Sequence, residues 1–424
     1  MEYLIQSKSK YYILVSKLLV FVFILGFISC KEHNKKSNSN LQIASNDHKI
    51  KVDKIITAAN QTEKYITLLK GKRVAVAANQ TSVVNVKSQK SKVKSRFIHL
   101  VDTLLSHNIN VVQVFSPEHG FRGKADAGEH VSNDIDNKTG LPIISLHGKT
   151  RKATPEMLKN IDIIVFDIQD VGVRFYTYIS TMSNLMEAAA ENNIPIIVLD
   201  RPNPNGHFVD GPTLELKHKS FVGMHAIPLV YGMTIGEYAK MVNGEKWLKD
   251  GLQCDLTVIP LKNYTHDLAY HLPIRPSPNL PNDKSINLYP GLGFFEGTII
   301  NAGRGTEYQF QRYGAPFFPK TDFCYTPQPN FGSKNPKFRG ELCYGVDLTK
   351  TPKLSKVDIS ALVDAYHKTP KEKEFFGKTF TIHAGNLKLQ QQIESGMKAK
   401  EIRATWQNDI EKFKLIRKKY LMYD

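Results

Sequence analysis

The alternation of short apolar runs with amphipathic stretches, from about residue 55 to residue 260, constrains the fold of this chain more than any other feature. The apolar runs are continuous, which is typical of strands that are buried on both faces of a sheet. Such alternation predicts an α/β fold with a mostly parallel sheet and helices on both faces. The expected strands are Val74–Ala78, Asn110–Phe115, Pro142–Leu146, Asp162–Ile168, Pro195–Asp200 and one near Asp255–Pro260, with helices over Phe97–His107 and Ser180–Asn193 and another that begins near Thr234.

The character of the sequence changes after Asp255 and indicates a second domain. Prolines cluster in HLPIRPSPNLPNDKS, glycines cluster in YPGLGFFEG and NAGRG, and aromatic residues are dense through Tyr325. We therefore expect an α/β domain over residues 55–252 and a smaller α+β domain over residues 253–424. The second domain should end in a basic amphipathic helix, Lys398–Leu421.

The N-terminus has the pattern of an export signal. Lysines precede an apolar run over residues 18–28, which stops at Ser29–Cys30. The run is shorter than the ~20 apolar residues of a membrane span. A cysteine directly after the break favours a lipoprotein signal peptide over residues 1–30, with Cys30 acylated; ordinary cleavage nearby and a retained anchor are the alternatives. We expect a flexible tether over residues 31–54 and an exported protein, lipid-anchored to a bacterial membrane on its periplasmic or cell-surface face.

Charge and cysteine content narrow the possible partners. The net charge of +17 would suit nucleic acid, anionic lipid or an acidic polymer. Export makes nucleic acid the poorest of the three, so we expect no nucleic-acid partner. Beyond Cys30 the chain has only Cys254, Cys324 and Cys343, which predict neither a disulfide framework nor a metal site of the paired-cysteine type.

Polar side chains gather where four of the expected strands end. In open parallel sheets, ligands bind at the carboxyl ends of the strands. A single acid or amide in such a place often caps a helix or forms a turn, but four clusters in register favour a site. The residues are Asn79 and Gln80 after the first strand, Glu118, His119 and Arg122 after the second, Asp167, Asp170, Arg174 and Tyr176 after the fourth, and Asp200, Arg201 and Asn203 after the fifth.

Motifs that the sequence lacks narrow the chemistry of this site. There is no Gly-x-Ser-x-Gly elbow of a serine hydrolase, and no glycine-rich loop that would hold a phosphate. Carboxylates, arginines and aromatic residues remain, and carbohydrate chemistry uses these groups. A glycosidase needs one carboxylic acid to protonate the leaving oxygen and a second group that faces the anomeric carbon. Aromatic rings offer faces to sugars, and amides and arginines bind their polar groups.

Several long motifs resemble one known family. FSPEHGFRG, GLPIISLHG, IIVFDIQDVGVRFYTY, VLDRPNPNG and YPGLGFFEGT…NAGRGTEYQF, in this order, resemble the NamZ-type exo-β-N-acetylmuramidases from about Lys72 to the C-terminus. The resemblance implies a Rossmann-like N-terminal domain, a smaller C-terminal domain and an active-site cleft between them. It also implies release of β-linked N-acetylmuramic acid (MurNAc) from non-reducing ends of peptidoglycan fragments, such as MurNAc-GlcNAc and muropeptides, in cell-wall turnover and recycling. One departure is His147, where the family pattern has tyrosine.

The resemblance suggests roles for individual residues. The family's glutamate in the Pro-Glu-His-Gly motif corresponds to Glu118, which we expect to be the general acid; a helix cap or a pair with Arg122 is the alternative. The second catalytic group is left open between carboxylates and the 2-acetamido oxygen of the substrate. The lactyl carboxylate of MurNAc calls for a fixed cation. The carboxylate candidates are Asp167, Asp170, Asp200 and Glu307, and the arginine candidates are Arg174, Arg201 and Arg304.

Two other functions fit the same residues. A non-catalytic lipoprotein could capture wall sugars with the same aromatic, arginine and amide groups. A metal-dependent hydrolase could use the three aspartates together with His119. We favour the glycosidase, for which no cofactor is expected.

Overall fold

The computed structural model describes residues 54–86, 96–123, 129 and 132–423. The predicted signal peptide, Cys30 and the predicted tether up to residue 53 lie outside the described residues. In the described part of the chain, every helix is too short or too polar to cross a membrane.

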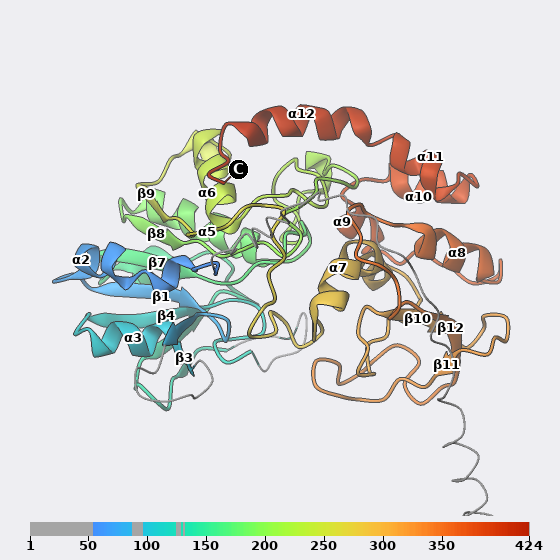
Figure 1. Ribbon diagram of the computed structural model, residues 1–424, viewed down its shortest axis with the longest axis horizontal. Coiled ribbons are helices and arrows are strands. Elements are labelled where there is room, and N and C mark those ends of the chain that lie inside the picture. The colour runs from blue at the N-terminus through green and yellow to red at the C-terminus, as the bar shows by residue number, and fades with distance from the viewer. Residues whose placement is uncertain (1–53, 87–95, 124–128, 130–131, 424) are drawn as a thin grey trace, which may run out of the picture. The chain divides into compact units, whose positions relative to one another are not determined.

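A seven-stranded sheet forms the centre of the N-terminal part of the described chain (Figure 1). Its order is β5-β6-β4-β1-β7-β8-β9, and all neighbours except β5 and β6 pair in parallel. Counted along the chain, the parallel strands have the order 3-2-1-4-5-6 of a Rossmann-like sheet, which confirms the predicted fold. The strands are β1 (Val74–Ala78), β4 (Val111–Ser116), β5 (Asp134–Ile135), β6 (Pro142–Ser145), β7 (Ile163–Asp167), β8 (Ile196–Leu199) and β9 (Leu256–Ile259).

Helices cover both faces of this sheet. Successive side chains of a strand point to opposite faces, and those of β1 are apolar at every position, so both faces need an apolar cover. Ala75 and Ala77 of β1 belong to the same apolar cluster as residues of α5 and α6. Val74 and Val76 belong to a second cluster with residues of α2 and α3. The helices of this part are α2 (Ile66–Leu69), α3 (Leu100–Ser106), α4 (Pro155–Leu158), α5 (Tyr178–Glu191) and α6 (Ile235–Gly244).

Two helix predictions were wrong in extent. The predicted helix Phe97–His107 begins with a strand, β3 (Arg96–His99), which pairs antiparallel with β2 (Val83–Val86). The helix starts only at Leu100, because the His99 ring caps it by accepting from the Val101 amide at 3.2 Å. The predicted terminal helix is divided into α11 (Ala399–Ala404) and α12 (Gln407–Lys418).

The C-terminal part is α+β, as predicted. Its strands form a three-stranded antiparallel sheet of order β10-β12-β11, and helices pack around it (Figure 1). β9 lies past residue 253 and still belongs to the large sheet, and the predicted boundary between the domains stays a prediction. The elements are α7 (Asp283–Leu292), η5 (Gly293–Gly297), β10 (Arg312–Ala315), β11 (Cys324–Tyr325), β12 (Cys343–Asp347), α8 (Ser360–Lys368), α9 (Phe380–Ala384) and α10 (Lys388–Glu394).

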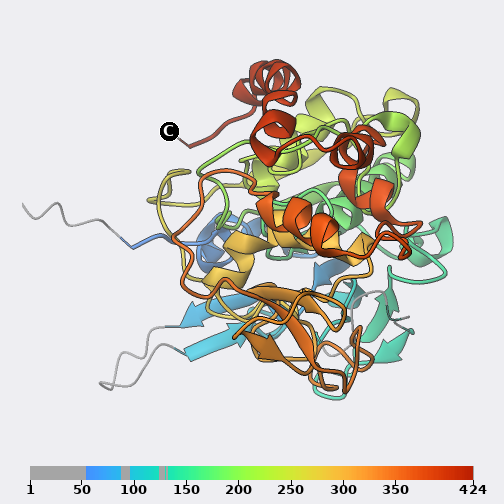
Figure 2. The same cartoon turned by 90° about the vertical axis from the view of Figure 1, so that its right-hand side faces the viewer.

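The end of the chain returns to the large sheet. Helix α12 lies beside α6, as Figure 2 shows, and Glu245 at the end of α6 accepts from Lys419 at 2.9 Å and from Tyr420 at 2.7 Å. The Tyr423 hydroxyl donates to Asp200, which follows β8. The C-terminal part is therefore fixed to the strand ends of the N-terminal sheet.

Candidate active site

Glu118 lies in a tight turn after β4. The two residues that follow it, His119 and Gly120, have positive φ angles of 69° and 76°, and the Gly120 amide donates to the Pro117 carbonyl at 3.0 Å. Glycine adopts such a conformation easily, whereas histidine does so at a cost, so the turn is a constrained one. The Glu118 side chain at the start of this turn lines a pocket.

Two neighbours fix the carboxyl group of Glu118. The Thr177 hydroxyl donates to Oε2 at 2.6 Å, and Nε2 of His147 lies 4.0 Å from Oε1. The Glu118 side chain is 14% exposed. A largely enclosed carboxyl group beside a hydroxyl and an imidazole ring is placed where it can take part in proton transfer to a ligand. His147, which departs from the family pattern, is therefore a direct neighbour of this group.

The Glu118 pocket has a volume of about 230 Å³. Both the sheet domain and the C-terminal part contribute to its wall, in agreement with the expected cleft between them. Its lining combines aromatic rings, two carboxyl groups, one side-chain amide and one arginine. The lining residues are Glu118, His119, Phe175, Tyr176, Thr177, Val222, Ser277, Asn279, Leu280, Tyr289, Glu296, Arg304, Phe310 and His383.

Aromatic side chains form one side of this pocket. Phe175 and Tyr176 each meet Tyr289 edge to face, with ring centroids 5.2 and 6.2 Å apart. Burial raises the pKa of Tyr289 well above its usual value, and the negative charges of Glu296 and Glu118 raise it further. The Tyr289 phenol thus stays neutral, and it lies close enough to both carboxyl groups to sense their charges.

Glu296 is a pocket carboxylate that the sequence analysis missed. It comes from η5, and both of its oxygens accept from Nη1 of Arg304, at 3.0 and 3.1 Å. Burial raises the pKa of Glu296, but the positive charges of Arg304, Lys337 and His383 outweigh this effect and lower it. Glu296 is therefore held ionised. Its place in the YPGLGFFEGT motif was a signal, but the sequence predicts a site from residues that follow strands, and η5 follows the helix α7.

The three candidate arginines have different surroundings. Arg174 is fully buried and donates to four backbone carbonyls, and burial lowers its pKa to about 9. Arg201 forms a buried ion pair with Asp167, at 2.6 and 2.8 Å. Neither of these arginines lines the Glu118 pocket, and Arg304 does. Arg304 is the candidate that can meet a ligand there.

The aspartate candidates are bonded elsewhere. Burial raises the pKa of Asp170 to about 7, and its Oδ2 accepts from the Gly172 amide at 2.6 Å and from the Tyr231 hydroxyl. Asp200 binds the start of α6, where it accepts from the Thr234 hydroxyl at 2.7 Å and the Gly236 amide at 2.8 Å. These two residues, Asp167 and the exposed Glu307 do not line the Glu118 pocket as it is described.

Of the other predicted binding residues, His119 and Tyr176 line the pocket. Gln80 acts at its edge, because Nε2 of Gln80 and the Tyr176 hydroxyl both donate to the Pro276 carbonyl, at 3.1 and 2.8 Å. This fixes the segment that carries Ser277 and Asn279. The remaining three bind protein groups: Asn79 accepts from Thr81, Arg122 pairs with Asp136 at 2.6 Å, and Asn203 donates to the Met233 carbonyl.

In the described part of the chain, no three histidine, cysteine or acidic side chains lie together so that they could hold a metal ion. The aspartates of the metal-dependent alternative are separated by their own contacts: Asp167 binds Arg201, and Asp200 binds the N-terminus of α6. The geometry instead brings together a carboxyl group with a hydroxyl partner, an ionised carboxylate and aromatic rings. This arrangement is the one that a glycoside hydrolase requires, with a carboxyl pair and aromatic faces in one pocket.

The comparisons with known proteins give the family. Residues 74–284 match the N-terminal family model of the exo-β-N-acetylmuramidase NamZ, and residues 287–423 match its C-terminal model. The chain therefore belongs to the NamZ exo-β-N-acetylmuramidase family and is a glycoside hydrolase, which confirms the resemblance found in the sequence.

Individual relatives agree with this assignment. The peptidoglycan β-N-acetylmuramidase NamZ of Bacillus subtilis (strain 168) is 42% identical over 381 residues, which cover 85% of this chain and 89% of that protein. The crystal structure of a DUF1343 family protein from Bacteroides fragilis is similar with a TM-score of 0.79 and 46% identity, over 88% of this chain and 99% of that one. A second such protein from the same organism has a TM-score of 0.73 and 31% identity, over 87% and 99%.

Proposed function

We propose that the Glu118 pocket releases β-linked MurNAc from the non-reducing ends of peptidoglycan fragments, among them MurNAc-GlcNAc and muropeptides, in cell-wall turnover and recycling. One observation carries the assignment to this pocket: the Glu118 carboxyl group, bonded to Thr177 at 2.6 Å, faces a pocket of about 230 Å³. This volume is below the roughly 300–1,000 Å³ of pockets for drug-sized ligands, and it suits a single sugar rather than a chain. A site for one terminal sugar is what an exo-acting enzyme needs.

In the proposed mechanism, Glu118 protonates the glycosidic oxygen as the bond to the anomeric carbon breaks, and the aglycone leaves with that proton. The oxygen of a water molecule then bonds to the anomeric carbon, and the proton that this water gives up restores the acid form of Glu118. Glu296, held ionised by Arg304, is the second carboxylate. It stabilises the positive charge that develops at the anomeric carbon, either directly or by orienting the acetamido group of the substrate. The two carboxyl groups have different surroundings: Glu118 accepts from the Thr177 hydroxyl and has Nε2 of the His147 ring 4.0 Å away, whereas Glu296 binds a guanidinium. This difference suits an acid and an anion that work side by side.

Arg304 is our candidate for the recognition of MurNAc. MurNAc differs from N-acetylglucosamine (GlcNAc) by a lactyl ether that bears a carboxylate, and enclosure of this carboxylate without a partner would be costly. Arg304 is the arginine that lines the pocket, and its guanidinium is oriented by Glu296 and by the Gly332 carbonyl, at 3.1 Å from Nη2. A guanidinium in a fixed orientation can bind a carboxylate with little loss of side-chain entropy.

Glu118→Gln tests the mechanism. Glutamine keeps the shape of the side chain but cannot donate the proton, so turnover of MurNAc-GlcNAc should fall by ~10²–10⁴. A MurNAc aryl glycoside has a good leaving group and should lose much less. Equal losses on both substrates would show that Glu118 is not the acid, and no release of MurNAc by the wild type would favour the sugar-binding alternative. Glu245→Gln is the matched control, because Glu245 does not line the Glu118 pocket and its carboxylate accepts from Lys419 and Tyr420.

An enzyme that acts on peptidoglycan works outside the cytoplasm. We propose further that export and lipidation at Cys30 attach this enzyme to a bacterial membrane, with residues 31–54 as the tether. The support for this is the sequence of the N-terminus alone.

A further inference from the structure

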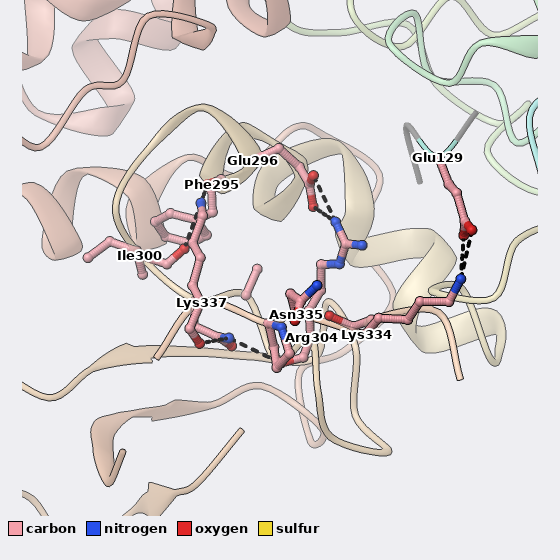
Figure 3. Close-up of a pocket in the computed structure, with 12 residues that line it drawn as sticks. Glu129, Phe295, Glu296, Ile300, Arg304, Lys334, Asn335 and Lys337 are labelled. Carbon is pink, nitrogen blue, oxygen red and sulfur yellow. Dashed lines mark hydrogen bonds and ion pairs between the residues drawn. The ribbon is translucent and has the colours of Figure 1, made fainter. Parts of the chain in front are cut away.

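A second pocket shares a wall with the Glu118 pocket. Its volume is about 450 Å³, roughly twice that of its neighbour. Glu296 and Arg304 line both pockets, and we name the second one the Lys334 pocket after a lysine at its side. Figure 3 shows Glu296 and Arg304 together, with Lys334 and Glu129 to one side and Lys337 to the other. A ligand that extends past the Glu296–Arg304 pair would pass from the first pocket into the second.

The positive groups of the Lys334 pocket are matched by negative or polar ones. Nζ of Lys334 binds both oxygens of Glu129, at 2.7 and 2.8 Å, and Arg304 binds Glu296. Nζ of Lys337 donates to the backbone carbonyls of Phe295, at 2.7 Å, and of Thr298 and Ile300. The lining thus offers both donors and acceptors with little excess charge. Such a surface suits a neutral ligand that is rich in hydroxyl and amide groups, whereas a phosphate or a polyanion would also meet two carboxylates.

The position of Glu296 relates this pocket to the reaction. In glycosidases the catalytic carboxyl groups flank the bond that is cleaved, so they lie between the released sugar and the leaving group. A carboxylate that lines two pockets therefore marks the boundary between these two parts of the substrate. If the terminal MurNAc occupies the smaller pocket, the larger one lies where the leaving group must be.

We propose that the Lys334 pocket is the leaving-group subsite and binds an uncharged N-acetylamino sugar, the GlcNAc unit of MurNAc-GlcNAc. This inference rests on the proposed function and assigns a site to the leaving-group half of the substrate. Asn335 lines the pocket and is exposed, so its amide is available to the hydroxyl groups of this sugar. Binding here holds the leaving oxygen next to Glu118 during proton transfer.

A variant that fills the pocket tests the proposal. Asn335→Trp places a large ring in the Lys334 pocket, at a residue that does not line the Glu118 pocket. Its kcat/KM on MurNAc-GlcNAc should fall about 10-fold or more, because the leaving-group sugar loses its place and its hydrogen bonds in the pocket. MurNAc β-fluoride has a leaving group too small to reach the pocket, so its kcat/KM should stay within about 2-fold of the wild type. Added GlcNAc should inhibit fluoride hydrolysis by the wild type and inhibit the variant much less.

The other possible results of this experiment separate a failure of the subsite proposal from a failure of the proposed function. Unchanged turnover of MurNAc-GlcNAc by folded Asn335→Trp would overturn the proposal, and so would equal losses on the disaccharide and the fluoride. A loss confined to substrates with a stem peptide would assign the pocket to the peptide and refute the sugar subsite. Failure of the wild type to hydrolyse the fluoride would instead refute the proposed function. Asn408→Trp, on the exposed side of α12, is the matched control, and Lys334→Met is a second variant of the same pocket that should show the same selective loss.

Discussion

Replacement of Arg304 by methionine tests whether the enzyme distinguishes MurNAc from GlcNAc by charge in the Glu118 pocket. Arg304 binds Glu296 through Nη1 and the Gly332 carbonyl through Nη2. Methionine keeps an unbranched side chain of similar reach but has no hydrogen-bond donors. The substitution therefore removes the guanidinium while most of the apolar contacts of the side chain remain.

The expected loss follows from the exposure of the pair. Removal of one partner of a buried charge pair across an interface costs ~2–5 kcal/mol. The Arg304 side chain is 20% exposed and already shares its charge with Glu296, so the lower end of this range applies. About 2 kcal/mol corresponds to a ~30-fold decrease in kcat/KM for MurNAc substrates. A GlcNAc substrate lacks the lactyl carboxylate, so the decrease in kcat/KM that comes from this contact does not apply to it.

The assay compares aryl β-glycosides of MurNAc and GlcNAc with the same leaving group. Any effect of the substitution on Glu296 reaches both substrates alike, so the ratio of their kcat/KM values isolates the carboxylate contact. Arg312→Met is the control, since Arg312 lies on β10 over the Tyr308 ring and does not line the Glu118 pocket. The thermal unfolding temperature of Arg304→Met shows whether the variant is folded. If a folded variant keeps the wild-type ratio of kcat/KM for the MurNAc and GlcNAc glycosides, other groups recognise the lactyl carboxylate and our reasoning is wrong.

Three further predictions concern stability and location. Arg201→Met leaves Asp167 buried without its ion pair and should destabilise the fold by ~3–5 kcal/mol in urea unfolding, whereas a small effect would show that the pair is dispensable. Burial raises the pKa of Asp200 from its usual 3.8 to about 7, so the folded protein holds the proton of this carboxyl group more tightly than the unfolded chain does. The stabilisation of the fold by protonated Asp200 is therefore fully present below about pH 4 and is lost as the pH rises through 7. Asp200→Asn should remove this dependence, and parallel pH profiles of the two proteins would contradict it. Cys30→Ser should release the protein from membranes or leave its signal uncleaved, and a cleaved variant that stays membrane-bound would contradict lipidation.

The large sheet was predictable because burial on both faces leaves a direct mark on the sequence. The run VAVAA coincides with β1 (Val74–Ala78), and IIVFD within the predicted fourth strand is β7 (Ile163–Asp167). The pair β2 and β3 left no such mark, since its residues are mostly half-buried or exposed. The start of α3 depends on a cap by the His99 ring, an unusual cap that composition does not reveal.

The sequence located the general region of the site better than its members. Acids after parallel strands can face a ligand, cap the next helix or pair with a buried arginine, and all three roles place them at the same positions in the chain. Asp200 binds the start of α6, and Asp167 pairs with Arg201. Their surroundings depend on segments far away in the sequence, such as Tyr423, which donates to Asp200. Periodicity contains no information about such contacts.

Several residues that the sequence analysis assigned to the substrate act on the pocket through the segments that they hold. Arg174 donates to the carbonyls of His383 and Ala384, at 3.0 and 2.8 Å, and so fixes α9, which contributes His383 to the pocket wall. Gln80 and Tyr176 hold the Pro276 carbonyl and the pocket segment after it. These bonds join the sheet, which carries Glu118, to the C-terminal part, which carries Glu296. Because a catalytic pair of carboxyl groups works only at a set separation, the proposed chemistry depends on these buried connections as much as on the groups that touch the sugar.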